Sequence, residues 1–223
     1  MKKSLVLSLF LVHVFMTAAQ EVDSITDIRD GRIYRIIKIG NQWWMQENLN
    51  IGTRIDRFQA PSDNGDIEKY CYDNSDSLCT VYGGLYRWNE MMDYNPSDSG
   101  TIGTTQGICP EGWHVPTDSE WKALKDFLGY WDAGGKIKEA GTVHWESENA
   151  GATNESGFTA LPGGHYGGIA TFTNICILAD FWSSTENESD EAWGYGLSHY
   201  SKSLDRDWED KEYGFSVRCV KDE

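Results

Sequence analysis

The sequence has little proline, few basic residues and, after its N-terminus, no long apolar segment. Proline occurs 5 times in 223 residues, and no Pro- or Ser-rich stretch divides the chain, so we expect a single domain. The chain has 19 Lys and Arg against 35 Asp and Glu, which gives a formal net charge of −16 at pH 7. Phosphate groups would repel so acidic a surface. The composition therefore excludes nucleic acid as a partner.

The one apolar run of note lies at the N-terminus. Two lysines precede an apolar stretch from Leu5 to Met16, and small residues follow as far as Ala19. This pattern predicts a secretory signal peptide over residues 1–19, with the mature chain beginning at Gln20. The stretch is shorter than the roughly 20 apolar residues that cross a bilayer, so we expect no transmembrane segment. The protein is expected to be secreted or to reside at the cell surface.

Sequence motifs of common enzyme classes are missing. The chain contains no G-x-S-x-G, no H-E-x-x-H, no phosphate-binding loop and no cysteine spacing typical of zinc sites. The acidic residues of Asp63-Asn64-Gly65-Asp66 suggest calcium, but this segment lacks the spaced carboxylates and the final glutamate of an EF-hand loop. We interpret it as a turn. We therefore predict no enzymatic activity, no metal site and no cofactor.

The strongest local signal in the sequence is the start of a helix. Thr117 and Glu120 form an S/T-x-x-E capping box, in which each side chain accepts a hydrogen bond from the backbone N–H of the other residue. Apolar residues then recur at helical spacing, and Gly129 stands where a left-handed C-cap is expected. The pattern predicts an amphipathic helix of about three turns that begins at Asp118. A second, short helix is expected around residues 85–92.

Antiparallel strands account for most other elements that the pattern predicts. Residues 32–39 and 42–49, separated by a Gly-Asn turn, predict a β-hairpin, and a long loop follows. Residues 158–162 are typical of a strand, and irregular backbone is expected in the glycine-rich segment 163–168.

The last third of the chain adds the segments FWSSTEN, EAWGYGLSHY and YGFSVRCV, which alternate in polarity and predict further strands. The side chains expected to point into the core are Phe181, Trp193, Phe215 and Val217. Strands that outnumber two helices give the fold class α+β.

Six segments carry a resemblance to a known family. They are IGNQWWMQENL at 39–49, YCYDN at 70–74, GGLYRWNEMM at 83–92, CPEGWHVPTDSEW at 109–121, WSSTEN at 182–187 and GFSVRCV at 214–220. Together they resemble the Fibrobacter succinogenes major paralogous domain family, with residues 20–29 as a short polar leader and residues 30–223 as the domain. This family is similar to the C-type lectins and to the formylglycine-generating enzyme domain. The resemblance implies a C-type-lectin-like fold in an exported bacterial protein.

Five cysteines in an exported chain indicate disulfide bonds. Cys71 and Cys79 flank a turn-rich segment, and we expect them to form a local bridge. Cys109 precedes the predicted helix, and Cys219 lies in the last strand of the family pattern, so we pair these two. Cys176 is left as a free thiol, which we interpret as a small buried residue because no flanking charge would lower its pKa.

The two related groups imply different activities. The formylglycine-generating relatives are oxidases that bind copper through two nearby cysteines late in the domain, whereas here Cys176 alone is unassigned. The lectin relatives hold calcium with a Glu-Pro-Asn or Gln-Pro-Asp loop followed by Trp-Asn-Asp, of which Glu186-Asn187 keeps a fragment. An oxidase remains an alternative function, and the motif does not support calcium-dependent sugar binding.

Residues 183–213 are rich in Tyr, Trp, Asn and Ser, a composition that resembles the exposed face of lectin-fold proteins diversified for ligand binding. The candidate ligand-binding residues are Tyr195, His199, Tyr200, Arg206 and Trp208. We predict an exported, non-catalytic module that binds a glycan or a protein. The remaining alternative is a structural component of the cell surface or matrix, in which these side chains only cover a sheet.

Overall fold

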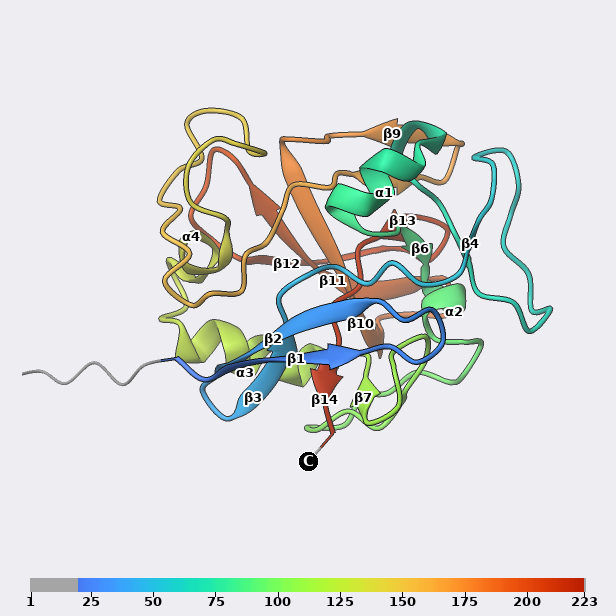
Figure 1. The fold of residues 1–223 in the computed structure, drawn as a ribbon, viewed down its shortest axis with the longest axis horizontal. Helices are drawn as coiled ribbons and strands as arrows, with labels where there is room; N and C mark the ends of the chain where they lie inside the picture. Colours follow the sequence, from blue (N-terminus) through green and yellow to red (C-terminus); the bar gives the residue numbers. More distant parts are fainter. Residues whose placement is uncertain (1–19, 223) are drawn as a thin grey trace, which may run out of the picture.

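The computed structural model describes residues 20–222, and the predicted signal peptide over residues 1–19 lies outside them. Antiparallel strands in several small sheets dominate, with few helices, which is consistent with the predicted α+β class (Figure 1). The strands are β1 Val22–Thr26, β2 Ile33–Ile39, β3 Gln42–Met45, β4 Thr53–Arg54, β5 Glu68–Lys69, β6 Tyr86–Arg87, β7 Trp113–His114, β8 His165–Gly167, β9 Thr171–Thr173, β10 Leu178–Glu186, β11 Glu191–Ser198, β12 Asp205–Asp210, β13 Gly214–Phe215 and β14 Val220–Lys221. The helices are the 3-10 turn η1 Tyr72–Asn74, α1 Asp76–Tyr82, α2 Trp88–Met91, α3 Asp118–Phe127 and α4 Ala133–Ile137.

A five-stranded sheet joins the two ends of the described chain. Its order is β1-β2-β3-β14-β7, so the last strand lies between a strand near the start and one from the middle of the sequence (Figure 1). The predicted hairpin is confirmed as β2 and β3, with Gly40 at φ +62° in the turn between them, a conformation that glycine adopts without steric cost.

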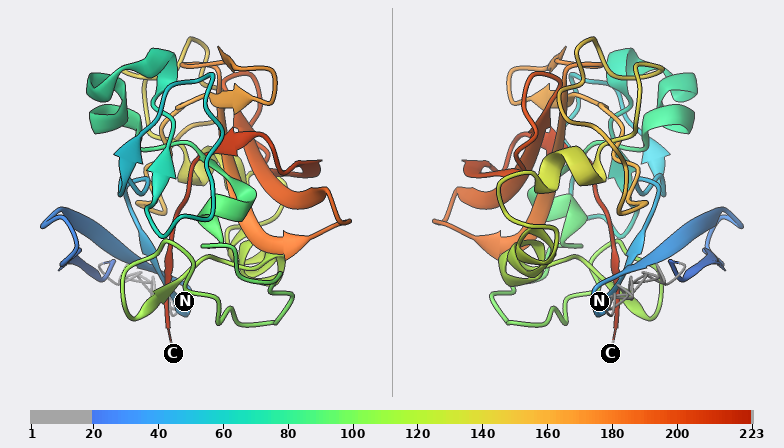
Figure 2. Two further views of the ribbon diagram at one scale, coloured as in Figure 1. Left: turned by 90° about the vertical axis from the view of Figure 1, so that its right-hand side faces the viewer. Right: turned by 90° about the vertical axis from the view of Figure 1, so that its left-hand side faces the viewer.

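The second main sheet is β10-β11-β12, which lies on the opposite side of the molecule from the β1–β2 hairpin and α1 (left view of Figure 2). Strands were predicted at residues 181–187 and 191–200 and are present as β10 and β11, but β12 was not predicted. Its sequence, DRDWED, is almost entirely polar, which hid it from a search for apolar alternation. Such composition suits an edge strand, because charged side chains discourage pairing with another chain.

Helix α3 packs between these two sheets and matches the prediction closely. It begins at Asp118 behind a complete capping box, and Gly129 has φ +99° just beyond its end. Trp121 is fully buried, 4.8 Å from the ring of Trp44 on β3 and 5.1 Å from the ring of Tyr195 on β11. This one side chain therefore connects both sheets.

Two predictions for the middle of the chain were wrong. Residues 158–162 form no strand, because the carbonyl groups of Phe158 and Thr159 accept hydrogen bonds from the buried guanidinium of Arg218 at 2.7 and 3.1 Å. The segment 163–168 is not wholly irregular, since residues 165–167 form β8 and pair with β9 and β13. Helix α1, which lies between the first two cysteines, was also not predicted.

Both predicted disulfides are confirmed, and Cys176 is the free cysteine among the described residues. The interpretation of Cys176 as a small buried residue was wrong. It is partly exposed, and its sulfur lies 3.9 Å from the hydroxyl of Tyr82. Cys176 lies in a turn and not in the core, and its left-handed backbone conformation (φ +66°) is typical of a turn.

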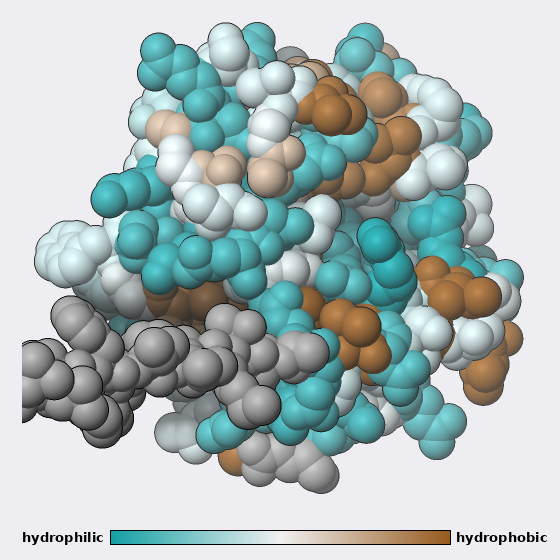
Figure 3. Space-filling view, turned by 60° about the vertical axis from the view of Figure 1, so that its left-hand side comes forward, coloured by the Kyte–Doolittle hydropathy of each residue, from teal (hydrophilic) through white to brown (hydrophobic). Residues whose placement is uncertain are grey.

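One face of the surface, shown in Figure 3, is largely hydrophilic. On the face shown in Figure 3, apolar side chains form separate spots rather than one continuous patch. Within residues 20–222 no helix is long and apolar enough to cross a membrane.

The two bridges should contribute unequally to stability. Cys109–Cys219 has a sequence separation of 110 and Cys71–Cys79 one of 8, so the chain-entropy relation assigns about 4–5 kcal/mol to the first and about 2–3 kcal/mol to the second. We expect the double variant Cys109→Ala/Cys219→Ala to lose more free energy of unfolding in urea than Cys71→Ala/Cys79→Ala. A larger loss from the short bridge would contradict this account.

Candidate functional site

The start of α3 presents a carboxylate to the β11–β12 ribbon. The carboxylate of Asp118 accepts hydrogen bonds from the hydroxyl of Tyr195 at 2.9 Å and from Nε and Nη2 of Arg206 at 2.6 and 3.0 Å, and Nζ of Lys122 lies 2.5 Å away. Burial alone would raise the pKa of Asp118, but the hydrogen bonds from Arg206, Lys122 and Tyr195 outweigh it, so this pKa is lowered. Asp118 therefore stays ionised and holds Arg206 in one orientation.

Arg206 lies over an aromatic ring on the neighbouring strand. Its guanidinium carbon is 3.2 Å from the ring centroid of Trp193, and Trp193 is paired directly with Trp208 across β11 and β12. Directly opposed residues share one face of a sheet, and residues two apart along a strand do the same. Trp193, Arg206 and Trp208 therefore form one surface, which we call the aromatic platform. Trp208 is its most open member, with 49% of its surface exposed.

Tyr195 does not belong to an exposed face, so its assignment as a ligand-binding residue is corrected. It is 1% exposed, and its ring stacks on Trp121. Burial, together with the neighbouring Asp118 carboxylate, raises the pKa of Tyr195, so the phenol keeps its proton and its hydroxyl donates a hydrogen bond to Asp118. Its contribution to the platform is indirect, because it helps to fix Asp118.

His199 and Tyr200 lie in the turn after β11 and not on the platform. Their ring centroids are 5.4 Å apart, Nδ1 of His199 is 3.2 Å from the carbonyl oxygen of Ser147, and Tyr200 is 71% exposed. From the level of Trp193 to the end of β11 is five residues, or roughly 17 Å of strand. The five predicted residues thus divide into the platform, the turn pair and a buried tyrosine.

Sequence reasoning missed Trp193 and Asp118 as parts of this site. Trp193 was assigned to the core, yet it is only partly buried, because Arg206 rather than an apolar residue covers it. Asp118 was interpreted only as the first helical residue. Recognising β12 in the charged run would have placed Trp208 opposite Trp193 and revealed the pair.

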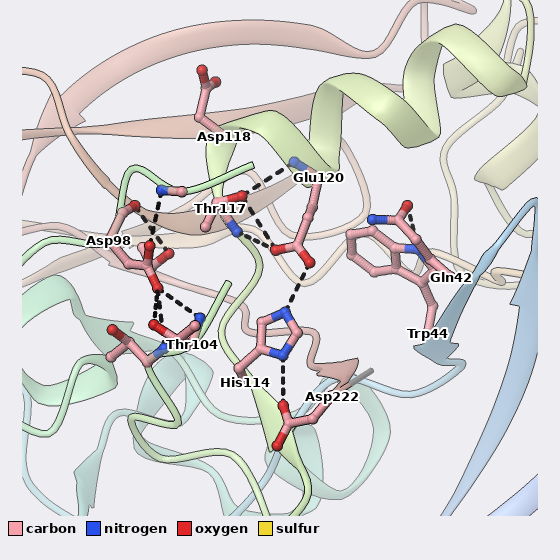
Figure 4. A network of polar contacts seen from close by, with 12 residues as sticks. Gln42, Trp44, Asp98, Thr104, His114, Thr117, Asp118, Glu120 and Asp222 are labelled. Atoms are coloured by element: carbon pink, nitrogen blue, oxygen red, sulfur yellow. Dashed lines mark hydrogen bonds and ion pairs between the residues drawn. The ribbon is translucent and has the colours of Figure 1, made fainter. Parts of the chain in front are cut away.

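A buried histidine fixes the chain just before this helix (Figure 4). Nε2 of His114 is 2.9 Å from Glu120, its Nδ1 is 2.7 Å from Asp222, and the other oxygen of Glu120 accepts from the backbone N–H of Thr117. Figure 4 shows Asp118 on the other side of the helix start from His114. The network therefore joins Asp222, just after the C-terminal strand, to the capping box and leaves Asp118 free to bind Arg206.

Tyr200 and Trp208 lie at the exposed surface. A polar cleft of about 860 Å³ lies between Arg29 and the loop of residues 93–107, and none of the five predicted residues lines it. Within residues 20–222 no group of three or more His, Cys, Asp or Glu side chains is arranged to hold a metal ion. What the arrangement offers is a flat aromatic surface with one fixed guanidinium.

The pKa of His114 predicts a pH-dependent contribution to stability. Burial lowers this pKa, but the hydrogen bonds to Glu120 and Asp222 more than offset the effect, so it is raised above its ordinary value. Protonation therefore stabilises the fold, fully so below the unfolded-state pKa of about 6.5, and this contribution disappears as pH rises through the folded-state value.

We expect His114→Gln to lower the Tm by a few degrees more at pH 5.5 than at pH 9, measured against wild type at each pH. Because both proteins are compared at the same pH, the effect of general repulsion among the acidic residues on Tm is common to both and cancels in the difference. Asp222→Asn, which removes one of the two carboxylates, should show a smaller difference between the two pH values. A larger loss of Tm at pH 9 would contradict the account.

The comparisons with known proteins concern the family alone. The model of the Fibrobacter succinogenes major domain matches residues 37–221, which include the disulfides, α3 and the aromatic platform. No match was found among curated proteins or among solved structures. Because the match extends over most of the chain, this protein belongs to the Fibrobacter succinogenes major domain family.

Proposed function

We propose that this protein is an exported binding module that recognises a glycan chain outside the cell through the aromatic platform. The observation that carries the proposal is Trp208, a half-exposed indole on an edge strand, beside an arginine that is already fixed by Asp118. Exposing the apolar face of an aromatic ring to water is unfavourable, so a ligand that covers this face gains binding free energy. A fixed guanidinium loses little entropy on binding.

A sugar suits the chemistry of this surface. Nε and Nη2 of Arg206 bind Asp118, which leaves Nη1 to donate to a hydroxyl group of a ligand. The flat face of the Trp208 indole can cover the apolar face of a sugar ring. The surface is open rather than enclosed, which favours a chain that lies across it over a small molecule that needs a deep pocket.

The separation of the exposed aromatic groups indicates a ligand of some length. Tyr200 lies in the turn beyond the end of β11, so it is more than about 17 Å along the ribbon from Trp208. One sugar ring cannot contact both. A chain that extends along β11 and β12 could contact the two, and each contact would then add to the affinity.

The finer fold assignment and the location form part of this proposal. A C-type-lectin-like fold is supported by the adjacent N- and C-terminal strands, the capped helix and the bridge from Cys109 to Cys219. Two disulfides support export, since such bonds persist in oxidising compartments. The oxidase alternative needs two cysteines, and the bridge occupies Cys219, so we do not propose it.

The test is binding to a glycan array and to insoluble plant polysaccharides, with wild type beside Trp208→Ala and Tyr200→Ala. Stacking on one ring contributes about 0.5–1.5 kcal/mol beyond its buried area, so each variant should bind roughly 2- to 10-fold more weakly with an unchanged Tm. Trp131→Ala is the matched control, because Trp131 is 79% exposed and lies outside the platform.

Each other outcome has a definite meaning. Unchanged binding by both Trp208→Ala and Tyr200→Ala would place the site elsewhere. If the protein binds a surface protein but no glycan, the ligand is a protein, and the aromatic platform stays the proposed site. Absence of any saturable ligand would favour the structural component of the cell surface or matrix.

A further inference from the structure

Three polar side chains away from the platform form a continuous hydrogen-bonded chain. The hydroxyl of Thr173 is 2.9 Å from Nε2 of His165, and Nδ1 of His165 is 2.9 Å from a carboxylate oxygen of Asp180. A hydroxyl, an imidazole and a carboxylate in this order are the groups of a nucleophile, its base and the residue that orients the base. We call them the Thr173 triad.

The fold brings these residues together through strand pairing. His165 and Thr173 are directly opposed across β8 and β9, so their side chains lie on the same face of that hairpin. Asp180 on β10 is paired with Gly196 on β11, and a Cβ added at Gly196 would lie 3.1 Å from the Asp180 carboxylate. Glycine at this position therefore leaves the space into which Asp180 extends.

The hydrogen bonds also fix the tautomer of His165. A carboxylate only accepts hydrogen bonds, so Asp180 requires the proton of the neutral imidazole to be on Nδ1. Nε2 is then an acceptor and receives the hydrogen bond of the Thr173 hydroxyl. The side chain of Thr173 is exposed, whereas His165 and Asp180 are 19% and 16% exposed. The reactive oxygen is thus accessible, and the two groups that activate it are held more firmly.

A cleft lies beside this hydroxyl. It has a volume of about 440 Å³ and is lined by His165, Thr171 and Thr173 from the hairpin and by Asp210, Glu212 and Tyr213 from the other side. Thr171 is two residues from Thr173 on the same strand, so both hydroxyl groups face the cleft. Thr171 therefore adds a second hydroxyl group to the lining of the cleft.

We propose that the Thr173 triad hydrolyses acyl esters. Oγ1 of Thr173 forms a bond to the carbonyl carbon while its proton moves to Nε2 of His165. The bond from that carbon to the alcohol oxygen then breaks, and the alcohol takes the proton and leaves. Water attacks the acyl-threonine by the same route, which releases a carboxylic acid and restores the hydroxyl group.

Charge selects the class of ester. Asp210 lines the cleft and Asp180 lies behind His165, so a substrate that carries its own carboxylate would be repelled. Glu212 also lines the cleft, but it is paired with Arg87 and adds less to this repulsion. The volume accommodates a short acyl group with an alcohol of about the size of one sugar. A neutral ester of a short carboxylic acid is therefore the substrate class.

The triad is independent of the aromatic platform. Asp180 is paired with Gly196 on β11, so the two residues share one face of the sheet. Successive residues of a strand point to opposite faces, so Trp193 and Tyr195 on β11 are on the other face. The two sites thus lie on opposite faces of the β10–β11–β12 sheet. Loss of one leaves the proposal for the other intact.

The test uses a fluorophosphonate probe with intact-mass detection, and p-nitrophenyl acetate as a neutral ester. Wild type should take up one probe molecule, mapped to Thr173, and the isosteric Thr173→Val should take up none and lose at least tenfold in ester hydrolysis. Thr173→Ser, a less hindered nucleophile, should be labelled faster than wild type. Thr101→Ala, a change at an exposed threonine outside the cleft, should behave as wild type.

Asp180 is a positioning residue, and its variant separates positioning from folding. Asp180→Asn should lower kcat at least tenfold while KM and Tm stay near the wild-type values, because only the imidazole tautomer is disturbed. The proposal is overturned if natively folded wild type takes up no probe, or if Thr173→Val is labelled or hydrolyses the ester as wild type does.

Discussion

The hydrogen-bonded start of α3 is the constraint on which the rest of the structure depends. The capping box of Thr117 and Glu120 ends in a buried histidine, His114, which in turn binds the C-terminal segment. One turn later Trp121 packs against both main sheets. A buried polar group without a hydrogen-bond partner destabilises the fold, so the start of α3 has one favourable geometry. In that geometry Asp118 points to the β11–β12 ribbon.

The sheet β10-β11-β12 presents different chemistry on its two faces. Trp193 and Arg206 are on one face, where the fixed arginine and the exposed Trp208 provide an open surface for binding. Asp180 is on the other face, where Gly196 leaves room for its carboxylate beside His165. Because side chains alternate between the two faces along a strand, one sheet carries the aromatic platform on one face and Asp180 on the other.

Local patterns in the sequence predicted what depends on local physics. The capping box, the Gly40 turn and the Cys71–Cys79 bridge were predicted, since each rests on a short stretch of sequence, whereas the Cys109–Cys219 pairing, over a separation of 110, was predicted with the help of the family resemblance. The strand β12 was not predicted, because its pairing with β11 compensates for a sequence without apolar alternation. Tyr195 was assigned to the wrong environment because composition cannot distinguish an exposed tyrosine from one that donates to a buried carboxylate. No sequence motif indicates the Thr173 triad, because the register between paired strands brings its residues together.

The central claim is that the aromatic platform contacts the ligand of this protein. The most direct measurement is an NMR titration of the tryptophan indole N–H signals with an oligosaccharide cut from a polysaccharide that the protein retains. The account predicts a saturable shift of the Trp208 signal, with the signal of Trp131, a more exposed indole outside the platform, unchanged. A titration in which Trp208 stays fixed while the oligosaccharide binds would contradict it.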